Sequence, residues 1–431
     1  MSGKVGSGAS RFDEYVNRLA EQLGHADRRE PLRAYLTGLL LPGERKSVEP
    51  MAAKIDPRNV SARHQSMHHL VASAPWDWRP LLAVARDYAL EQIERHAPVA
   101  TWVVDDTGMP KKGTHSVGVA RQYCGRLGKQ DNCQVVVTLS MANTIMSVPC
   151  AYRLYLPEVW IQDRKRCREA GIPEEISFAT KWEIALAEID QLLAEDLPRA
   201  PVTGDAGYGT VTAFRDGLTH RGLSYALAIP KETSLWLPGS QPFAPKRWSG
   251  RGRPALRVRR TRRHHPLSAG ELAKRIPQQN WKTVRWREGT RGTMRSRFAA
   301  VRVRPAHRDE NLHQPRPEEW LLVDWPSQER EPRKYWLSTV PENVSLQDLV
   351  QLAEIRWRID RDYQELKSEL GLGHYEGRSW LGFHHHGTLC IAAYAFLAAE
   401  RARLSPPEPL AFLKAARLPK SFRPRGASVA S

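Results

Sequence analysis

Two short stretches of this sequence, Val99-Ala-Thr-Trp-Val-Val-Asp-Asp-Thr-Gly108 and Pro201-Val-Thr-Gly-Asp-Ala-Gly-Tyr-Gly209, decide its fold class. Each is a short apolar run that ends in an acid and then a glycine-containing turn, which is typical of a buried strand. In α/β sheets, ligands bind in the crevice outside the carboxyl ends of the strands. The pattern predicts that Asp105 and Asp205 lie at such ends, although an ordinary turn at a strand end remains an alternative for each.

The segments around these stretches extend the pattern. We expect strands over residues 116–123, 133–141, 150–156 and 223–229, and helices over 178–194 and just after residue 209. The first strands read as an antiparallel set, and a strand over 335–340 with helices over 346–370 and 384–403 resumes the core. This order of elements, with acids at two strand ends, predicts an α/β fold with a ribonuclease-H-like mixed sheet.

Changes in composition and apolar spacing along the chain predict five regions. Apolar residues at three-to-four spacing over 12–23 and 80–96 indicate a helical start, while Arg, Gly and Pro dominate the segment after residue 230. The regions are a helical N-terminal domain that we expect to bind DNA (1–97), the first part of the core (98–230), a basic β-rich insertion (231–335), the helical second part of the core (336–403) and a loosely ordered tail (404–431).

The positive charge of the chain is concentrated in the insertion. The formal net charge is +18, and residues 246–308 alone contain 20 Lys and Arg against 2 Asp and Glu, so the rest of the chain is neutral. A local excess of this size attracts a polyanion through counterion release, and nucleic acid is the commonest such partner. A solvated face or an anionic lipid surface is the alternative, which the lack of an amphipathic membrane helix disfavours.

Composition excludes several other classes of protein. Hydrophobic residues make up 41% of the chain, which is enough for sizeable cores and excludes disorder throughout. The five cysteines include no CxxC pair, so a disulfide scaffold and a zinc finger are both disfavoured. No apolar run approaches the roughly 18 residues of a membrane span, and the N-terminus has no signal-peptide core. We therefore expect no membrane partner and a cytoplasmic location.

A third acid is expected on the helix near residue 360. Residues i, i+4, i+7 and i+11 of a helix share one face, which groups Arg356, Asp360, Tyr363 and Lys367. Glu365 lies about 140° around the helix from Asp360, so both acids cannot point into one site. A surface ladder of ion pairs would give the same spacing and remains an alternative.

Three carboxylates on such a core suit the chemistry of phosphodiester cleavage. Oxygen ligands alone favour Mg²⁺ or Mn²⁺, and two such ions about 3.5–4 Å apart activate a nucleophile and stabilise the leaving oxygen. We expect Asp105, Asp205 and Asp360 to be both catalytic residues and metal ligands. The cations expected to contact DNA are Lys111 and Lys112 in a tight turn, Arg356 and Lys367 beside the third acid, and Arg259, Arg260, Arg262 and Arg263 in the insertion.

The motifs together resemble those of DDE transposases of bacterial insertion sequences, in the branch with a β-rich insertion before the third acid. The resemblance covers the chain from about residue 38 to about residue 400. The pieces that carry it are Gly38-Leu-Leu-Leu-Pro-Gly-Glu-Arg-Lys-Ser47, Val104-Asp-Asp-Thr-Gly108 with Pro110-Lys-Lys-Gly113, Gly204-Asp-Ala-Gly-Tyr-Gly209, Arg356-Trp-Arg-Ile359, Tyr363-Gln-Glu-Leu-Lys367 and Glu376-Gly-Arg-Ser-Trp380.

The resemblance implies a DNA transposase that cuts at the inverted repeats of its own element and joins the ends to target DNA. It implies two Mg²⁺ or Mn²⁺ ions, double-stranded DNA at the element ends and the target as partner, a homodimer in the synaptic complex, and a nucleoid-associated place in a bacterial cytoplasm. The family's Asp-x-Thr pattern selects Asp105 over Asp106. Two positions depart from the family's third-acid signature: Ala353 replaces a tyrosine, and Asp360 replaces a glutamate and so is shorter by about one C–C bond.

Two other functions remain open from the sequence. One is a metal-dependent nuclease that cleaves DNA without joining it, and the other is a domesticated DNA-binding protein whose catalytic site has decayed, as the shorter acid at Asp360 permits. The run His384-His-His386 looks like a metal-binding tract, but three consecutive helical residues point in three directions. We therefore expect packing and polar roles for these histidines.

Overall fold

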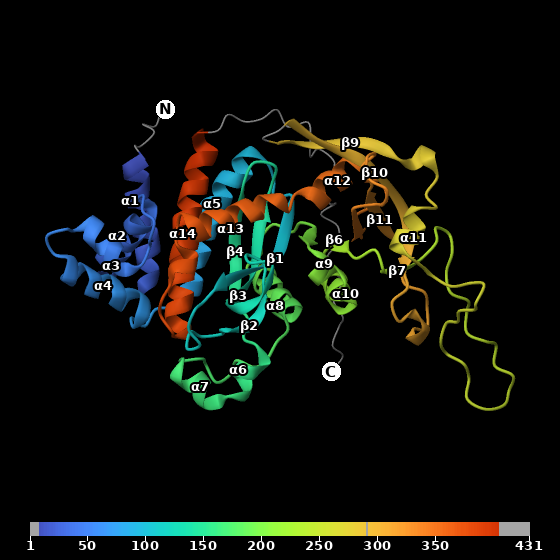
Figure 1. The fold of residues 1–431 in the computed structure, drawn as a ribbon, viewed down its shortest axis with the longest axis horizontal. Helices are drawn as coiled ribbons and strands as arrows, with labels where there is room; N and C mark the ends of the chain where they lie inside the picture. The colour runs from blue at the N-terminus through green and yellow to red at the C-terminus, as the bar shows by residue number, and fades with distance from the viewer. Residues whose placement is uncertain (1–7, 290–291, 405–431) are drawn as a thin grey trace, which may run out of the picture.

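The computed structural model describes residues 8–289 and 292–404, and the helical start of the chain packs on the core of the molecule (Figure 1). Tyr15 donates a hydrogen bond to the carbonyl of Ala392 (2.9 Å), and Arg11 forms an ion pair with Glu400. One buried apolar cluster runs from these helices into the sheet. The helices are α1 (Gly8–Ala20), α2 (Arg29–Leu40), α3 (Val48–Ile55), α4 (Val60–Ala72) and α5 (Trp78–His96), with short 3-10 turns at Glu21–Leu23 and Ala26–Arg28.

A mixed sheet organises the rest of the described chain. Its central strand, β1, pairs antiparallel with β3 and parallel with β5, and β5 pairs parallel with β6. Since β3 also pairs antiparallel with β2 and β4, the expected antiparallel set of early strands is confirmed. These strands are β1 (Thr101–Pro110), β2 (Ala120–Cys124), β3 (Lys129–Ala142), β4 (Ser147–Leu154), β5 (Val202–Gly204) and β6 (Tyr225–Ile229).

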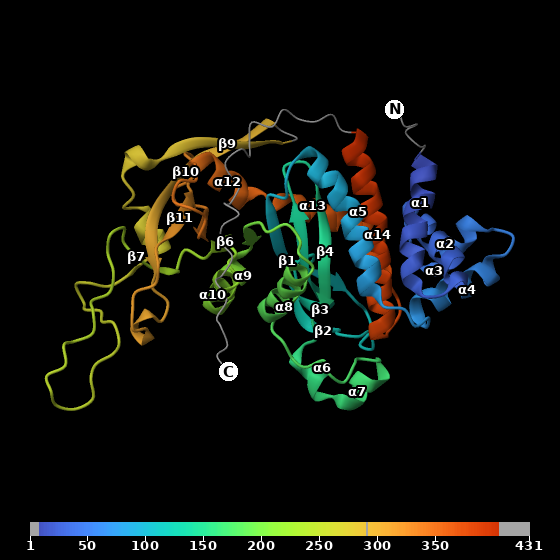
Figure 2. The ribbon, with the colours of Figure 1, turned by 180° about the vertical axis from the view of Figure 1, so that it is seen from behind.

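The strands of the insertion continue the same sheet. The order β2-β3-β1-β5-β6-β12-β11-β10-β7-β8 runs from one edge of the sheet to the other, with β9 paired to β10. In both views the strands that follow β6 in the sequence lie at the end of the molecule away from α1–α4 (Figures 1 and 2). They are β7 (Ser234–Trp236), β8 (Leu267–Ser268), β9 (Lys282–Gly289), β10 (Gly292–Pro305), β11 (Glu319–Asp324) and β12 (Lys334–Ser338), with the short helix α11 (Ala269–Ala273) and 3-10 turns at Gln278–Asn280 and Asp309–Asn311.

Helices cover the central strands. Helices α5 and α14 pack against β4, and α8 packs against β3 and β4. These helices are α6 (Glu158–Gln162), α7 (Arg164–Glu169), α8 (Lys181–Ala194), α9 (Ala206–Gly209), α10 (Thr212–His220), α12 (Leu346–Glu354), α13 (Trp357–Ser368) and α14 (Trp380–Leu404), with a 3-10 turn at Leu372–His374. None of the helices in the described part of the chain combines the length and the apolar character that crossing a bilayer requires.

The single helix expected over residues 346–370 is wrong, because the structure has two helices with a break at Ile355 and Arg356. Ile355 ends α12, and Arg356 is the N-cap residue of α13. The amide of Arg358 donates to the carbonyl of Ile355 (3.1 Å), which tightens the chain locally. The break lets Arg356 reach β1, so a tertiary contact overrides the helical periodicity of the sequence. The predicted tail, residues 404–431, lies outside the described residues from position 405 onward.

The three consecutive histidines of α14 are buried and face three different surroundings. His384 stacks on Trp78, His385 stacks on Trp76 with its Nε2 2.9 Å from that residue's carbonyl oxygen, and His386 contacts the Tyr35 hydroxyl (2.8 Å). Burial lowers the pKa of His384 to about 3 and that of His386 to about 4. The histidines are therefore packing residues of α14, as their spacing predicted.

The glycine at the end of α9 is required by backbone packing. A Cβ atom on Gly209 would lie 1.9 Å from the carbonyl oxygen of Ala228 in β6. The absence of a side chain at Gly209 therefore lets the neighbouring strand approach. The close approach fixes α9, and therefore the end of β5, against the sheet.

We expect Gly209→Ala to lower the free energy of unfolding by about 3 kcal/mol, because the new methyl group must displace backbone. Gly113→Ala is the control, since a Cβ atom there meets no atom within 4 Å, and it should change stability by less than about 0.5 kcal/mol. Urea unfolding followed by circular dichroism measures both. Equal stabilities of the two variants would contradict this packing role.

Candidate active site

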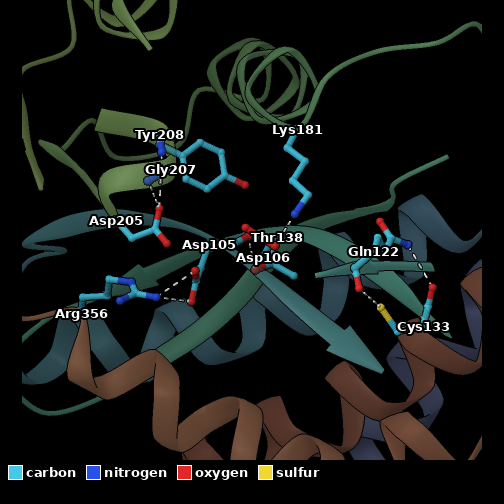
Figure 3. A network of polar contacts seen from close by, with 10 residues as sticks. All are labelled: Asp105, Asp106, Gln122, Cys133, Thr138, Lys181, Asp205, Gly207, Tyr208 and Arg356. Carbon is cyan, nitrogen blue, oxygen red and sulfur yellow. Dashed lines mark hydrogen bonds and ion pairs between the residues drawn. The ribbon is translucent and has the colours of Figure 1, made fainter. Parts of the chain in front are cut away.

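The first acid pair lies in the middle of the sheet. Asp105 and Asp106 belong to β1 and pair with β3, and they lie just beyond Val104, the last residue of β1 that pairs with β5. Asp105 is buried, with 5% of its surface exposed, and Asp106 is half-buried. Lys181, at the start of α8, donates to a carboxylate oxygen of Asp106 (2.7 Å; Figure 3). The charge of Asp106 is thus already matched by a lysine, whereas Asp105 faces Arg356.

The second acid follows the neighbouring parallel strand in register. Val104 of β1 pairs with Gly204 of β5, so Asp105 and Asp205 are the next residues on two adjacent strands. Asp205 caps α9 and accepts hydrogen bonds from the backbone amides of Gly207 (2.9 Å) and Tyr208 (3.4 Å). Figure 3 shows the carboxylates of Asp105 and Asp205 on the same side, with Arg356 beside them. The register of the sheet therefore brings these two acids together.

Arg356 connects the strand acids to the C-terminal helices. One of its terminal nitrogens contacts both carboxylate oxygens of Asp105, at 2.9 and 3.0 Å. Burial alone would lower the pKa of this guanidinium, but the charges of Asp105, Asp360 and Asp205 raise it overall. Arg356 thus lies within the field of all three acids that the sequence singled out.

The third acid borders the same cavity. A cavity of about 400 Å³ is lined by residues of β1, the β2–β3 turn and α13, among them Asp105, Arg356 and Asp360. Asp360 lies in the first turn of α13 and is exposed, so it forms the solvent side of the cavity. Asp205 lies beside the cavity and is not one of its lining residues. Glu365 points elsewhere and pairs with Arg401 and Arg361, as the helical geometry predicted.

Burial sets the protonation of Asp105. Removal from water raises its pKa, and the charge of Asp205 raises it further, while Arg356 lowers it; the resulting pKa is about 7. A carboxyl group with this pKa holds a proton about half the time at neutral pH. A cation placed beside Asp105 would favour its ionised form.

The carboxylates offer suitable ligands for a divalent cation but do not form a closed site in this conformation. Within residues 8–289 and 292–404, no group of three His, Cys, Asp or Glu side chains lies close enough to hold an ion. The guanidinium of Arg356 occupies the cationic position on Asp105. Oxygen donors on two adjacent strand ends match the preference of Mg²⁺ and Mn²⁺. The donor chemistry therefore fits such an ion. In this structure the positive charge next to Asp105 is the guanidinium of Arg356.

The two lysines of the tight turn and the two cations beside the third acid lie in three different surroundings. Lys111 donates to the carbonyl of Tyr375 (2.5 Å), and burial lowers its pKa to about 8. Lys112, next to it, is exposed. Lys367 lines the cavity with Arg356, and burial lowers its pKa as well. Lys367 and Arg356 therefore face the acids, Lys112 faces solvent, and Lys111 is held by the fold.

The four insertion arginines also divide into two kinds. Arg260 forms an ion pair with the buried carboxylate of Asp309, so it stabilises the insertion itself. Arg259 donates to the carbonyl of Ala244 (3.0 Å) but remains exposed. Arg262 and Arg263 are exposed and form no hydrogen bond or ion pair with other residues of the described chain. Only part of the predicted set is thus available to a partner.

Sequence reasoning missed two residues of the site. Lys181, which holds Asp106, follows a capping threonine and carries no pattern that marks it. Arg126 lines the cavity from the turn between β2 and β3. A signal for Arg126 was present, because residues 107–130 contain five Lys and Arg and no acid.

Comparison with known proteins identifies the family. Residues 18–293 match the family model described as DDE superfamily endonuclease. A curated relative from Microchaete diplosiphon, described as a probable transposase for insertion sequence element IS701, is 31% identical over 166 residues, which is 38% of this chain and 40% of the relative. This alignment thus spans about two fifths of the relative's length. Among solved structures, the piggyBac transposase in a synaptic complex with hairpin DNA is similar with a TM-score of 0.44 and 10% identity, over 94% of this chain and 78% of that one.

Because the family model matches well over half of its residues, the chain belongs to the DDE superfamily endonucleases, and the resemblance drawn from its motifs is confirmed. The matched segment contains Asp105 and Asp205 and ends before Asp360. Members of this family generally use divalent metal ions.

We expect Arg356→Met to raise the pKa of Asp105 above its value of about 7, because the guanidinium that favours the carboxylate is lost. A carboxyl group whose pKa is raised by folding contributes stability that is present below about pH 4 and lost as the pH rises to about 7. Because the variant raises the pKa of Asp105 further, its folded state should go on losing stability to a higher pH than the wild-type protein does. Carbon-13 NMR of aspartate carboxyl groups in metal-free protein measures the pKa. Arg361→Met, on the exposed side of α13, is the control, and an unchanged Asp105 pKa in Arg356→Met would contradict the assignment.

Proposed function

We propose that this protein is a DNA transposase that cuts at the inverted repeats of an insertion sequence and joins the released ends to target DNA. The observation that carries the proposal is the in-register pair Asp105 and Asp205 on adjacent parallel strands, beside a cavity that Asp360 also lines. The family match and the description of the IS701 relative support the same activity.

The core of this transposase is a ribonuclease-H-like fold. The order β4-β3-β1-β5-β6, with three antiparallel strands followed by two parallel ones, supports this proposal. Asp105, just beyond the last β1 residue that pairs with β5, and Asp205, which follows β5, lie at neighbouring positions of this sheet. The β-rich insertion then enters after β6 and returns through β12, which keeps the cationic segment attached to the edge of the catalytic sheet.

Asp105, Asp205 and Asp360 would hold two Mg²⁺ or Mn²⁺ ions. When bound, such ions activate a hydroxyl nucleophile and stabilise the leaving oxygen of a phosphodiester. The chain's own residues supply the remaining functions. Lys181 holds Asp106, which leaves Asp105, now paired with Arg356, as the acid of β1 that would hold a metal ion. Arg356 leaves Asp105 for a phosphate oxygen, and Lys367 contributes a second positive charge at the cavity.

Double-stranded DNA lies along the insertion. In the β9–β10 ribbon, Arg285 stands directly opposite Arg295, and both are exposed. Like charges in this position destabilise a strand pair, and an anionic partner such as DNA would offset the repulsion. Arg287 of the same ribbon stacks over Trp357 at the start of α13 (4.1 Å to the ring centre), which links the ribbon to the helix that carries Asp360. The N-terminal helices would supply a further DNA contact.

Joining two element ends requires two catalytic centres, so we propose a homodimer in the synaptic complex. The protein would act on the nucleoid in a bacterial cytoplasm, where its DNA substrate lies. A nuclease without strand transfer is the alternative, and the first prediction below separates the two.

Asp105→Asn and Asp205→Asn should each reduce cleavage of DNA that carries the element ends by at least about 10³-fold, because each change removes a metal-binding charge. Asp106→Asn is the matched control and should retain cleavage, since Asp106 is held by Lys181. The assay also supplies pre-cleaved ends with a target plasmid and Mg²⁺. Joined products support a transposase, and cleavage without joining in the wild-type protein would replace the proposal with the nuclease.

Neutralising five exposed arginines of the insertion should weaken DNA binding and flatten its dependence on salt. The five are Arg251, Arg253, Arg257, Arg262 and Arg263, changed to Gln. Each lost phosphate contact lowers the slope of log K against log salt concentration by about 0.9. Fluorescence anisotropy with a labelled duplex over a range of KCl concentrations measures the slope. Unchanged affinity and slope would show that this segment does not hold DNA.

A further inference from the structure

The turn between β2 and β3 brings a second group of cations to the catalytic cavity. Strand β2 pairs antiparallel with β3 from Ala120 to Cys124, and a four-residue turn, Gly125-Arg-Leu-Gly128, joins them. The amides of Leu127 and Gly128 donate to the carbonyl of Cys124 (2.9 and 3.0 Å). Gly128 takes a positive φ of 63°, which closes the turn. We call residues 120–133 the β2–β3 hairpin.

The outer side of this hairpin is cationic and free of internal partners. Arg121 and Arg126 are exposed, and neither forms a hydrogen bond or an ion pair within the described residues. Tyr123, between them on the same face of β2 as Arg121, exposes 59% of its surface. Residues 107–130 contain no acid, and the nearest one along the chain, Asp131, is paired with Lys129 (3.2 Å). The charge of Arg121 also contributes to the lowered pKa of Asp131, so part of the hairpin's positive charge is offset, while the side chain of Arg126 forms no hydrogen bond or ion pair with the described residues.

Arg126 faces a second cation across the cavity. Gly125 and Arg126 line the cavity together with Lys367, Arg356 and Asp105. The proximity of Arg126 contributes to the lowered pKa of Lys367, for which burial is the main cause. The charges of Asp105 and Asp360 in the same cavity offset part of the repulsion between Arg126 and Lys367, and an anion bound between the two cations would reduce it further.

The hairpin and the insertion stand on opposite sides of the catalytic acids. The sheet order runs from β2 through β3, β1, β5 and β6 to the insertion strands, so the strands that carry Asp105 and Asp205 lie between the two cationic elements. A DNA strand held only by the insertion would be fixed on one side of the cleaved bond. A contact on the β2 side would fix it on the other.

We propose that the β2–β3 hairpin is a backbone clamp, in which Arg121 and Arg126 bind DNA phosphates on the side of the cleavage site away from the basic insertion. This inference rests on the proposed function, because the cavity must process DNA for the bound anion to be a DNA phosphate. Arg126, at the cavity wall, holds the phosphate nearest the catalytic acids, and Arg121 holds the strand further along the hairpin. Both are positioning residues, since neither touches the reacting bond.

The test measures DNA binding by the full-length protein in EDTA, so that cleavage does not interfere. The probe is a fluorescein-labelled DNA duplex, titrated at several KCl concentrations. Arg126→Ala should lower the slope of log K against log salt concentration by about 0.9, and Arg121→Ala combined with Arg126→Ala by about 1.8. Arg126→Lys should restore the slope, because a lysine also releases a counterion on binding phosphate.

Arg199→Ala is the matched control. Arg199 is exposed like Arg126, but it precedes β5, whereas Asp205 follows that strand, so it lies at the opposite end of the catalytic sheet. The control should keep the wild-type slope. If Arg126→Ala and Arg199→Ala behave alike while the wild-type protein binds DNA, the clamp is refuted and the proposed function is not affected. If the wild-type protein itself binds no DNA, the proposed function fails first.

Discussion

The burial of the Asp105 carboxylate is the constraint on which the rest of the site depends. Burying a carboxylate in the middle of a sheet costs free energy of solvation, and the raised pKa of Asp105 reflects that cost. Arg356 offsets part of it by contacting both oxygens. To do so, the chain must end α12 and begin α13 at the position of Arg356. The position of the C-terminal helices therefore follows from a charge on the central strand, through the ion pair that joins residues 251 positions apart.

Much of the fold was predictable because its signals are local. The β-branched runs that lead to Asp105 and Asp205 indicated the two strands. Strand β1 continues past Asp105 to Pro110, so the predicted strand end was too early, and the two acids are neighbours because Val104 pairs with Gly204. The break at Arg356 was not predictable, because the helical spacing of residues 346–370 is unbroken and only the contact with β1 interrupts it. The continuity of the insertion with the catalytic sheet was hidden for the same reason: the pairing of β12 with β6 joins segments far apart in the sequence.

The site itself was predictable by residue type and less so by role. Arg356, Asp360 and Lys367 were expected on one helical face, and all three line the cavity. The spacing of residues could not show which cations are free to bind a partner, because some of them are bound by acceptors that lie far away in the sequence. Lys111 donates to the carbonyl of Tyr375, and Arg260 pairs with the buried carboxylate of Asp309. Composition finds a cationic segment, but only tertiary contacts separate the charges that stabilise the fold from those that face a partner.

The geometry of α13 couples two events that the chemistry requires. Arg356 caps this helix and Asp360 lies in its first turn, so the two residues are one turn apart on the same face. Arg356 now neutralises Asp105, while Asp360 remains at the solvent side of the cavity. Under the proposed function, a phosphate that drew Arg356 away from Asp105 would leave that carboxylate open to a metal ion, with Asp360 at the same cavity. For the shorter Asp360 to serve as the third acid under this proposal, the first turn of α13 would have to approach the sheet more closely, and the short connection at Ile355 is where the chain could supply that movement.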